Sequence, residues 1–273
     1  MTSKTPEPPN PGRDPYAPAE IAHLVENVGV SKANLPLLPL VVLGILAGAF
    51  IAFGAMFFTL SIPGSTLGFG PTRLIGGLVF SLGLILVIIA GAELFTGNNL
   101  IVMAWADRKV TTGQLLRNWV IVYIANFVGA GATAGMVFWS GTLGLGDGAV
   151  AETAIAIATG KLSMTWFEAF VRATLCNALV CLAVWLSMSA HRVAGKILAI
   201  IFPITAFVAL GFEHSVANMY LLPLGWLLGA EGVTFGAMAA NLVPVTIGNI
   251  VGGSVFVALV YWLVYLRPDR QSG

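Results

Sequence analysis

Apolar residues run almost without interruption through six stretches of the chain, and short polar segments separate these stretches. The stretches span roughly 35–60, 74–105, 114–140, 163–188, 197–228 and 241–266. A helix crosses the hydrocarbon layer of a membrane, which is ~30 Å thick, in about 20 residues. Each stretch is therefore long enough to cross it. The pattern predicts an all-α membrane protein with six transmembrane helices.

The second and fifth stretches are too long for one straight, untilted helix. Each contains roughly 32 residues, which would extend ~48 Å at ~1.5 Å per residue. Both carry charge near the middle, at Glu93 in one and at Glu213 beside His214 in the other. A charge that faces lipid there is costly, whereas irregular backbone is tolerated where it faces protein or water. We therefore predict that both helices are broken at these residues.

The segment before the first span is polar and rich in proline, without the layout of a secretory signal. Asp14 and Pro15 are typical of a helix start. Four apolar residues follow at helical spacing, namely Ile21, Leu24, Val25 and Val28. The pattern predicts a short amphipathic helix beside the membrane, which either anchors the segment at the surface or regulates a pore.

Composition agrees with a membrane location. Hydrophobic residues make up 58% of the 273 residues and charged residues only 9%, whereas soluble domains carry about 25% charged residues. The net charge of +1 argues against a nucleic-acid partner. Cys176 and Cys181 lie on different faces of one predicted helix, so we interpret them as core residues. We expect no metal and no cofactor.

The cations are distributed unequally between the two predicted sides of the membrane. Ten of the thirteen Lys and Arg residues fall on the side of both termini, Arg73 and Lys161 fall on the other, and Arg172 lies within the fourth stretch. Positive charge favours the cytoplasm. We therefore expect a cytoplasmic tail with its short helix at residues 1–34, a channel domain at 35–266 and a cytoplasmic C-terminal tail at 267–273.

An internal repeat coincides with the two predicted breaks. Residues 91–98 match residues 211–218 in the pattern G-x-E-x-x-x-x-N, and residues 118–129 match residues 241–252 in N-x-V-x-V-x-I-x-N-x-V-G. The repeats, about 35–140 and 163–266, hold three spans each, so they enter the membrane from opposite sides. In such inverted repeats the binding site lies near the midplane, where the ends of broken helices meet the ligand.

The breaks supply the candidate functional residues. His214 is a titratable group inside the membrane, so it is either a proton donor to a permeating anion or a plain polar residue bonded between helices. We expect Thr96, from the first break, to face it. Four residues are expected to hold the broken loops in shape, namely Glu93, Glu213, Asn98 and Asn218. Direct contact with the substrate is the alternative for the two glutamates, and an anion pathway disfavours it.

Other polar residues near the predicted spans have simpler interpretations. Lys161 at the outer mouth either attracts anions or is a solvated interface lysine, and Asn177 is expected to line a pore. Glu168 and Arg172, four residues apart, are predicted to form an ion pair. Asn126 and Asn249 are expected to bond across helices. Three glycine pairs at i and i+4 predict close packing, namely Gly44/Gly48, Gly131/Gly135 and Gly248/Gly252.

Four segments together resemble the motifs of the formate/nitrite transporter family. They are Ala92–Gly97, Asn177–Trp185, Gly211–Met219 and Asn241–Gly253. The resemblance covers about residues 14–268 and is strongest to the bacterial formate channels. It implies an aquaporin-like protomer, a homopentamer whose central hole is plugged by membrane lipid, and a location in the bacterial inner membrane.

The resemblance also implies roles for particular residues. His214 matches the central pore histidine, Thr96 its hydroxyl partner, and Lys161 and Asn177 the outer lysine and the pore asparagine. Six residues fall where the family places apolar constrictions, namely Phe80, Leu84, Leu94, Phe95, Val180 and Phe207. Residues 16–30 match the position of the amphipathic helix that is proposed to gate family members at low pH.

The function that follows is a channel for small monovalent anions, formate and also nitrite, with pH-dependent protonation of the permeant assisted by His214. A nitrite or hydrosulfide channel of the same family is the alternative. A membrane enzyme is disfavoured because the spans contain a single histidine and no Cys/His spacing typical of a metal site. A water channel is disfavoured because the breaks lack paired Asn-Pro-Ala segments.

Overall fold

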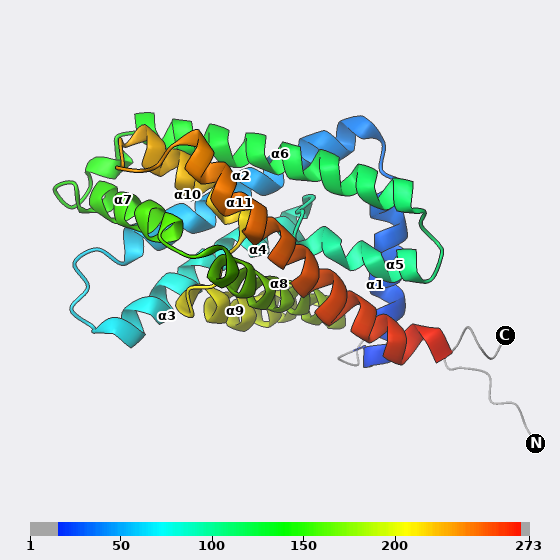
Figure 1. Ribbon diagram of the computed structural model, residues 1–273. Coiled ribbons are helices and arrows are strands. Elements are labelled where there is room, and N and C mark those ends of the chain that lie inside the picture. The colour runs from blue at the N-terminus through cyan, green and yellow to red at the C-terminus, as the bar shows by residue number, and fades with distance from the viewer. Residues whose placement is uncertain (1–15, 269–273) are drawn as a thin grey trace, which may run out of the picture.

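The computed structural model describes residues 16–268, which form helices and connecting segments without a strand (Figure 1). Five helical segments there are long and apolar enough to cross a membrane. Three are single helices, namely α2 (Leu37–Ser61), α6 (Thr112–Trp139) and α8 (Trp166–Ser189). The other two are composite. One joins α3 (Phe69–Phe80), α4 (Leu82–Leu86) and the π-helix η1 (Val87–Gly91), and one joins α11 (Phe235–Ile250) to the π-helices η4 (Val251–Leu259) and η5 (Trp262–Leu266).

The two long stretches are broken at the residues that the charge pattern predicts. After η1 the chain is non-helical until the short helices η2 (Gly97–Ile101) and α5 (Val102–Ala106). The fifth stretch divides into α9 (Val193–Ala209) and α10 (Ser215–Leu227), and therefore supplies no helix of full spanning length. Both breaks begin at a glycine with positive φ, +86° at Gly91 and +72° at Gly211. Other residues rarely adopt this conformation.

The amphipathic helix α1 (Pro18–Ala33) lies at the opposite end of the bundle from α7 (Ala149–Leu162), as Figure 1 shows. It packs on η2 and α5, so protein and not only lipid covers its apolar side. The predicted helix start at Asp14 and Pro15, the rest of the first 15 residues and residues 269–273 lie outside the described residues. The helix α7 is an element that the sequence analysis does not predict.

A charged contact fastens α1 to the loop after α5. The Glu26 carboxylate is only 1% exposed and accepts a 2.6 Å hydrogen bond from Lys109 Nζ. Burial raises the pKa of Glu26, and the bond from Lys109 opposes that shift. Lys109 also lies 3.5 Å from Asp107 Oδ2, and Trp262 Nε1 donates to Asp107 at 3.3 Å. These contacts join α1, the loop and the C-terminal helical segment.

Small residues bring α2 against α6 and α8 against α11, which are the most extensive helix contacts among the described residues. A Cβ added to Gly129 would collide with the Ile45 carbonyl oxygen, and one added to Gly252 with the Thr174 carbonyl oxygen. A Cβ on Gly131, by contrast, would meet nothing within 4 Å. The predicted packing is therefore confirmed for Gly44/Gly48 and Gly248/Gly252. Within this chain, Gly129 takes the place that the sequence analysis assigns to Gly131 and Gly135.

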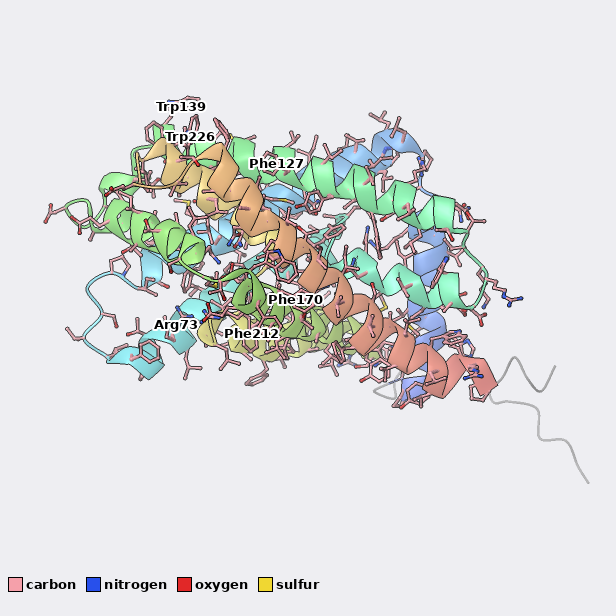
Figure 2. All side chains as sticks on the ribbon, in the orientation of Figure 1. Arg73, Phe127, Trp139, Phe170, Phe212 and Trp226 are labelled. Carbon is pink, nitrogen blue, oxygen red and sulfur yellow. The ribbon has the colours of Figure 1, made fainter. Side chains whose placement is uncertain are left out.

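The lateral surface of the bundle is apolar. Phe127 on α6 is 43% exposed, and Trp139 and Trp226 lie together at one end of the bundle (Figure 2). Tryptophan prefers the boundary between the hydrocarbon layer and water. This surface suits contact with lipid or with other subunits.

Candidate functional site

A closed ring of hydrogen bonds holds the second break in place. Lys161 Nζ donates to Glu213 Oε1 at 2.8 Å. Asn218 Nδ2 donates to the other carboxylate oxygen, Glu213 Oε2, at 2.7 Å and to Asn241 Oδ1 at 2.8 Å. Asn241 Nδ2 then donates to the Lys161 carbonyl oxygen at 3.0 Å. The charge of Glu213 is thus paired and hydrogen-bonded, as a buried carboxylate requires.

The first break contains the same ring. Lys32 Nζ donates to Glu93 Oε1 at 2.6 Å. Asn98 Nδ2 donates to Glu93 Oε2 at 2.7 Å and to Asn118 Oδ1 at 2.9 Å, and Asn118 Nδ2 donates to the Lys32 carbonyl oxygen at 3.0 Å. Lys32 lies in α1 and Lys161 in α7, so these two helices are equivalent parts of the two rings. Sequence reasoning missed Lys32.

One asparagine from each half supports the backbone of a break. Asn249 Oδ1 accepts from the Ser215 N–H at 2.9 Å, and its Nδ2 donates to the carbonyls of Ala173 and Glu213 at 2.9 and 3.0 Å. The bonds of Asn126 are equivalent. Its Oδ1 accepts from the Phe95 N–H at 2.9 Å, and its Nδ2 donates to the carbonyls of Gly44 and Glu93 at 2.7 and 2.9 Å. The bonds to the Ser215 and Phe95 N–H groups and to the Glu213 and Glu93 carbonyls satisfy backbone groups that the breaks leave without a helical partner. The bonds to the Ala173 and Gly44 carbonyls fasten each asparagine to an intact helix, α8 or α2.

Thr96 and His214 meet where the two breaks approach each other. Thr96 Oγ1 lies 2.9 Å from His214 Nε2, and both side chains are buried. The Ala217 N–H donates to His214 Nδ1 at 3.1 Å. Because Nδ1 accepts, Nε2 carries the proton of the neutral ring and donates to the threonine hydroxyl. The repeat places Leu94 and Val216 at the equivalent positions, so this polar pair has no counterpart across the repeat.

Asn177 ties the first break to the second half of the chain. Its Nδ2 lies 3.2 Å from the Thr96 carbonyl oxygen, 2.8 Å from Asn99 Oδ1 and 2.7 Å from the Asn249 carbonyl oxygen. Its Oδ1 has no hydrogen-bond partner among the described residues. Asn177 therefore positions Thr96 through the Thr96 carbonyl group, and the acceptor Asn177 Oδ1 is left without a partner there.

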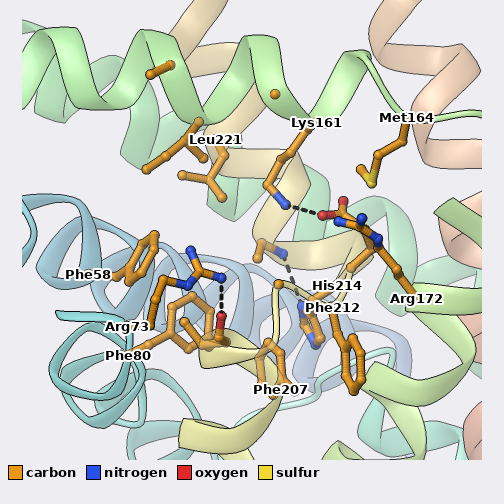
Figure 3. Close-up of a pocket in the computed structure, with 17 residues that line it drawn as sticks. Phe58, Arg73, Phe80, Lys161, Met164, Arg172, Phe207, Phe212, His214 and Leu221 are labelled. Carbon is orange, nitrogen blue, oxygen red and sulfur yellow. Dashed lines mark hydrogen bonds and ion pairs between the residues drawn. The ribbon is translucent and has the colours of Figure 1, made fainter. Parts of the chain in front are cut away.

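A cavity of about 240 Å³ leads toward His214 from the α7 end, and we call it the Lys161 vestibule (Figure 3). Its polar wall includes Lys161, Arg73 and Arg172, and its apolar wall includes Phe80 and Phe207. The Phe80 and Phe207 rings meet edge to face with centroids 5.5 Å apart, and the Phe207 ring stacks on His214 at 5.8 Å. His214 itself lines this cavity, so the charged side chains, the two aromatic rings and the imidazole face one chamber.

The six residues predicted as constrictions all belong to one buried apolar cluster. Phe80 and Phe207 line the Lys161 vestibule. Phe95 instead packs against Trp119 and Tyr123 of α6, with ring centroids 6.2 and 4.9 Å apart. Leu84, Leu94 and Val180 are buried in the same cluster.

A second cavity, of about 460 Å³, opens toward α1, and we call it the Lys32 vestibule. Its lining includes Lys32, Glu93, Gly91, Leu43 and Lys196. The Lys161 vestibule reaches His214, the Lys32 vestibule reaches Glu93 of the first break, and each has a Lys–Glu ion pair in its wall.

The model of one known family, described as formate/nitrite transporter, matches residues 19–263, which is most of the chain. The chain belongs to the formate/nitrite transporter family. The family's relatives include an uncharacterised transporter, YrhG, of Bacillus subtilis, which is 46% identical over 257 residues (93% of this chain, 95% of the relative). They also include the formate channel FocA of Escherichia coli, 39% identical over 275 residues (94% and 96%).

Solved structures of the formate/nitrite transporter family share the fold. One, described as a pentameric formate channel with formate bound, superposes with a TM-score of 0.79 at 38% identity and covers 84% of this chain and 98% of its own. Another, described as an FNT family ion channel, gives a TM-score of 0.82 at 32% identity (90% and 98%). This chain is thus a multi-pass membrane protein that transports small anions, and it is not an enzyme.

Proposed function

We propose that this protein is a homopentameric formate channel of the bacterial plasma membrane, that it also carries nitrite, and that both its termini are cytoplasmic. The observation that carries the proposal is the buried Thr96–His214 pair, whose histidine lines a vestibule together with Lys161, Arg73, Arg172 and the Phe80 and Phe207 rings. FocA, the formate channel of Escherichia coli, and the pentameric structure with formate bound are relatives over almost the whole chain. They support the choice of formate and of five subunits.

The site's chemistry suggests how an anion would cross. A bare carboxylate is expensive to move into an apolar wall, whereas neutral formic acid crosses it readily. In the neutral ring, Nε2 donates to Thr96 and Nδ1 accepts from Ala217. A proton from vestibular water adds at Nδ1 in place of the Ala217 contact. The Nε2 proton then passes to a carboxylate oxygen, directly or through the Thr96 hydroxyl, which leaves the ring neutral with its proton on Nδ1. Uptake of a proton at Nε2 and release of the Nδ1 proton restore the starting tautomer and the Ala217 contact.

The His214→Ala variant in proteoliposomes tests this assignment. We expect wild-type formate flux to rise as the pH falls. At acidic pH the flux through the variant should be lower than that of the wild type by about tenfold or more, which is in the range of acid–base catalysis by one side chain. His191→Ala removes a histidine from an exposed loop and serves as the matched control, with unchanged flux. Size-exclusion chromatography in detergent monitors the folded oligomer.

Nitrite or hydrosulfide is the alternative permeant. Both are small monovalent anions that the same vestibule would admit. If nitrite flux were faster than formate flux and did not change in His214→Ala, nitrite would be the substrate. His214 would then be a structural polar residue.

A further inference from the structure

The two vestibules have equivalent backbones but different charges. The Glu93 N–H donates to the Leu43 carbonyl at 3.1 Å, and the Glu213 N–H makes the equivalent bond to the Arg172 carbonyl at 3.4 Å. Leu43 and Arg172 therefore occupy matching positions on α2 and α8. The Lys161 vestibule thus has a guanidinium where the Lys32 vestibule has an aliphatic side chain.

Arg172 does not form the ion pair predicted from its spacing. The Glu168 carboxylate instead accepts from the backbone N–H and the hydroxyl of Thr165, both at 2.9 Å, in the cap of α8. Among the described residues no ion pair or hydrogen bond occupies the Arg172 guanidinium, and its side chain lines the vestibule (Figure 3).

A second arginine faces the same place. Arg73 Nε and Nη2 donate to the carbonyls of Ala209 and Val208 at 3.0 and 2.7 Å, so the last turn of α9 fixes its guanidinium. A Cβ added to Gly211 would lie 3.3 Å from Arg73 Nη2 and 4.0 Å from Arg172 Nη1. Both guanidiniums therefore approach the space over Gly211, which lacks a side chain.

The charge balance of the Lys161 vestibule favours an anion. Arg73, Lys161 and Arg172 are its lining cations, and Glu213 is its lining carboxylate. Glu213 already pairs with Lys161, which leaves the two arginines without a counter-charge in the wall. Among the described residues that line the Lys32 vestibule, the Lys–Glu ion pair leaves a single ammonium, Lys196, and no guanidinium. Guanidinium groups bind carboxylates through two parallel hydrogen bonds, and the apolar wall limits competition from water.

We propose that Arg73 and Arg172 form a capture site for small carboxylates in the Lys161 vestibule, and that the Lys32 vestibule has no equivalent. Where the permeant is formate, as proposed above, this site makes the channel half-saturate at a lower formate concentration from the Lys161 side than from the Lys32 side. The captured anion lies in the same cavity as His214, beside the Phe80 and Phe207 rings.

The test exchanges the residues at the matching positions. Arg172→Leu gives the Lys161 vestibule the leucine that the Lys32 vestibule has at the matching position. Leu43→Arg gives the Lys32 vestibule a guanidinium at that position. Formate flux is measured in each direction across vesicles of known orientation, at a series of concentrations and at two ionic strengths. Arg73 is left intact because it also caps α9. Arg192→Leu, in an exposed loop, is the control and should match the wild type.

Arg172→Leu should raise the half-saturating formate concentration on the Lys161 side about tenfold, as expected for loss of a charged hydrogen bond, and should leave the maximal rate within about twofold. The direction dependence and the salt sensitivity of the wild type should both decrease, and Arg73 retains the remainder. Leu43→Arg should lower the half-saturating concentration on the Lys32 side. Equal half-saturation in both directions for the wild type, or no change in Arg172→Leu, would overturn the capture site.

A binding measurement separates this inference from the proposed function. Formate binding to the purified protein is followed by saturation-transfer NMR on the formate proton, with Arg172→Leu and Arg192→Leu compared directly. Formate binding that depends on Arg172, in a protein that carries no formate flux, would support the capture site and refute the formate channel. Binding equal in both variants would refute the capture site whatever the flux.

Discussion

Asn249→Leu is expected to cost several kcal/mol of stability and to abolish the folded oligomer. The side chain has nearly the same size, but it can no longer bond the Ser215 N–H or the carbonyls of Ala173 and Glu213. Each backbone group left buried and unpaired costs ~1–3 kcal/mol. The Ser215 N–H and the Glu213 carbonyl are two such groups, whereas the Ala173 carbonyl lies within α8, and two groups already amount to a large part of the stability of a typical protein, ~5–15 kcal/mol. Thermal unfolding of the purified protein in detergent measures the loss.

Thr246→Val on the same helix is the control for Asn249→Leu. It removes one side-chain hydrogen bond, to the Tyr123 hydroxyl at 2.8 Å, and should cost ~1 kcal/mol. If Asn249→Leu unfolded at the same temperature as Thr246→Val, the asparagine would not be what holds the second break.

Gly129→Ala should separate α2 from α6 and lower stability by ~1–3 kcal/mol or more, as overpacking does. The new methyl group would collide with the Ile45 carbonyl oxygen, which belongs to backbone and cannot rotate away. The change is a single carbon atom, so altered polarity cannot explain the effect. Yield of folded oligomer and its thermal unfolding temperature are the readouts.

Gly131→Ala provides a control two residues along the same helix. A Cβ there meets nothing within 4 Å, and alanine is favoured over glycine in a helix by ~1 kcal/mol. We expect wild-type stability or a slight gain. Equal losses in the two variants would mean that Gly131 packs against another subunit, and the contrast between the positions would then fail.

The sequence predicted the breaks well because their determinants are local. Gly91 and Gly211 supply positive φ angles, and Asn98 and Asn218 each bond a glutamate only five residues away. Such contacts leave a short motif, which repeats. The contact between Thr96 and His214 also follows once the two motifs are placed opposite each other in an inverted repeat.

The lysines of the two rings are harder to find because they arrive from distant helices. Lys32 lies 61 residues from Glu93, and Lys161 lies 52 residues from Glu213. The segments between each lysine and its glutamate differ in length, 61 residues against 52. The single offset that aligns the two G-x-E-x-x-x-x-N motifs therefore does not align the two lysines. Aligning the helix ends separately would have detected the correspondence.

Arg172 shows the opposite failure, in which a local rule was applied and was wrong. The i, i+4 spacing brings Glu168 within reach of Arg172. The Glu168 carboxylate instead accepts a hydrogen bond from the Thr165 N–H at the N-terminus of α8, where backbone N–H groups lack helical partners. Because Glu168 is bonded in the helix cap, the Arg172 guanidinium is left unpaired among the described residues and lines the vestibule. The motif Thr165-x-x-Glu168 is a capping box and would have predicted this outcome.

The paired rings leave the protein with a scaffold that has almost no built-in direction. Turned over in the membrane, it would present nearly the same backbone to each compartment. The two halves differ at a small set of matched positions, such as Leu43 against Arg172 and Leu94 against His214. A direction dependence of formate flux, as the proposed capture site predicts, would arise from a few side chains and would be reversed by exchanging them without redesigning the fold.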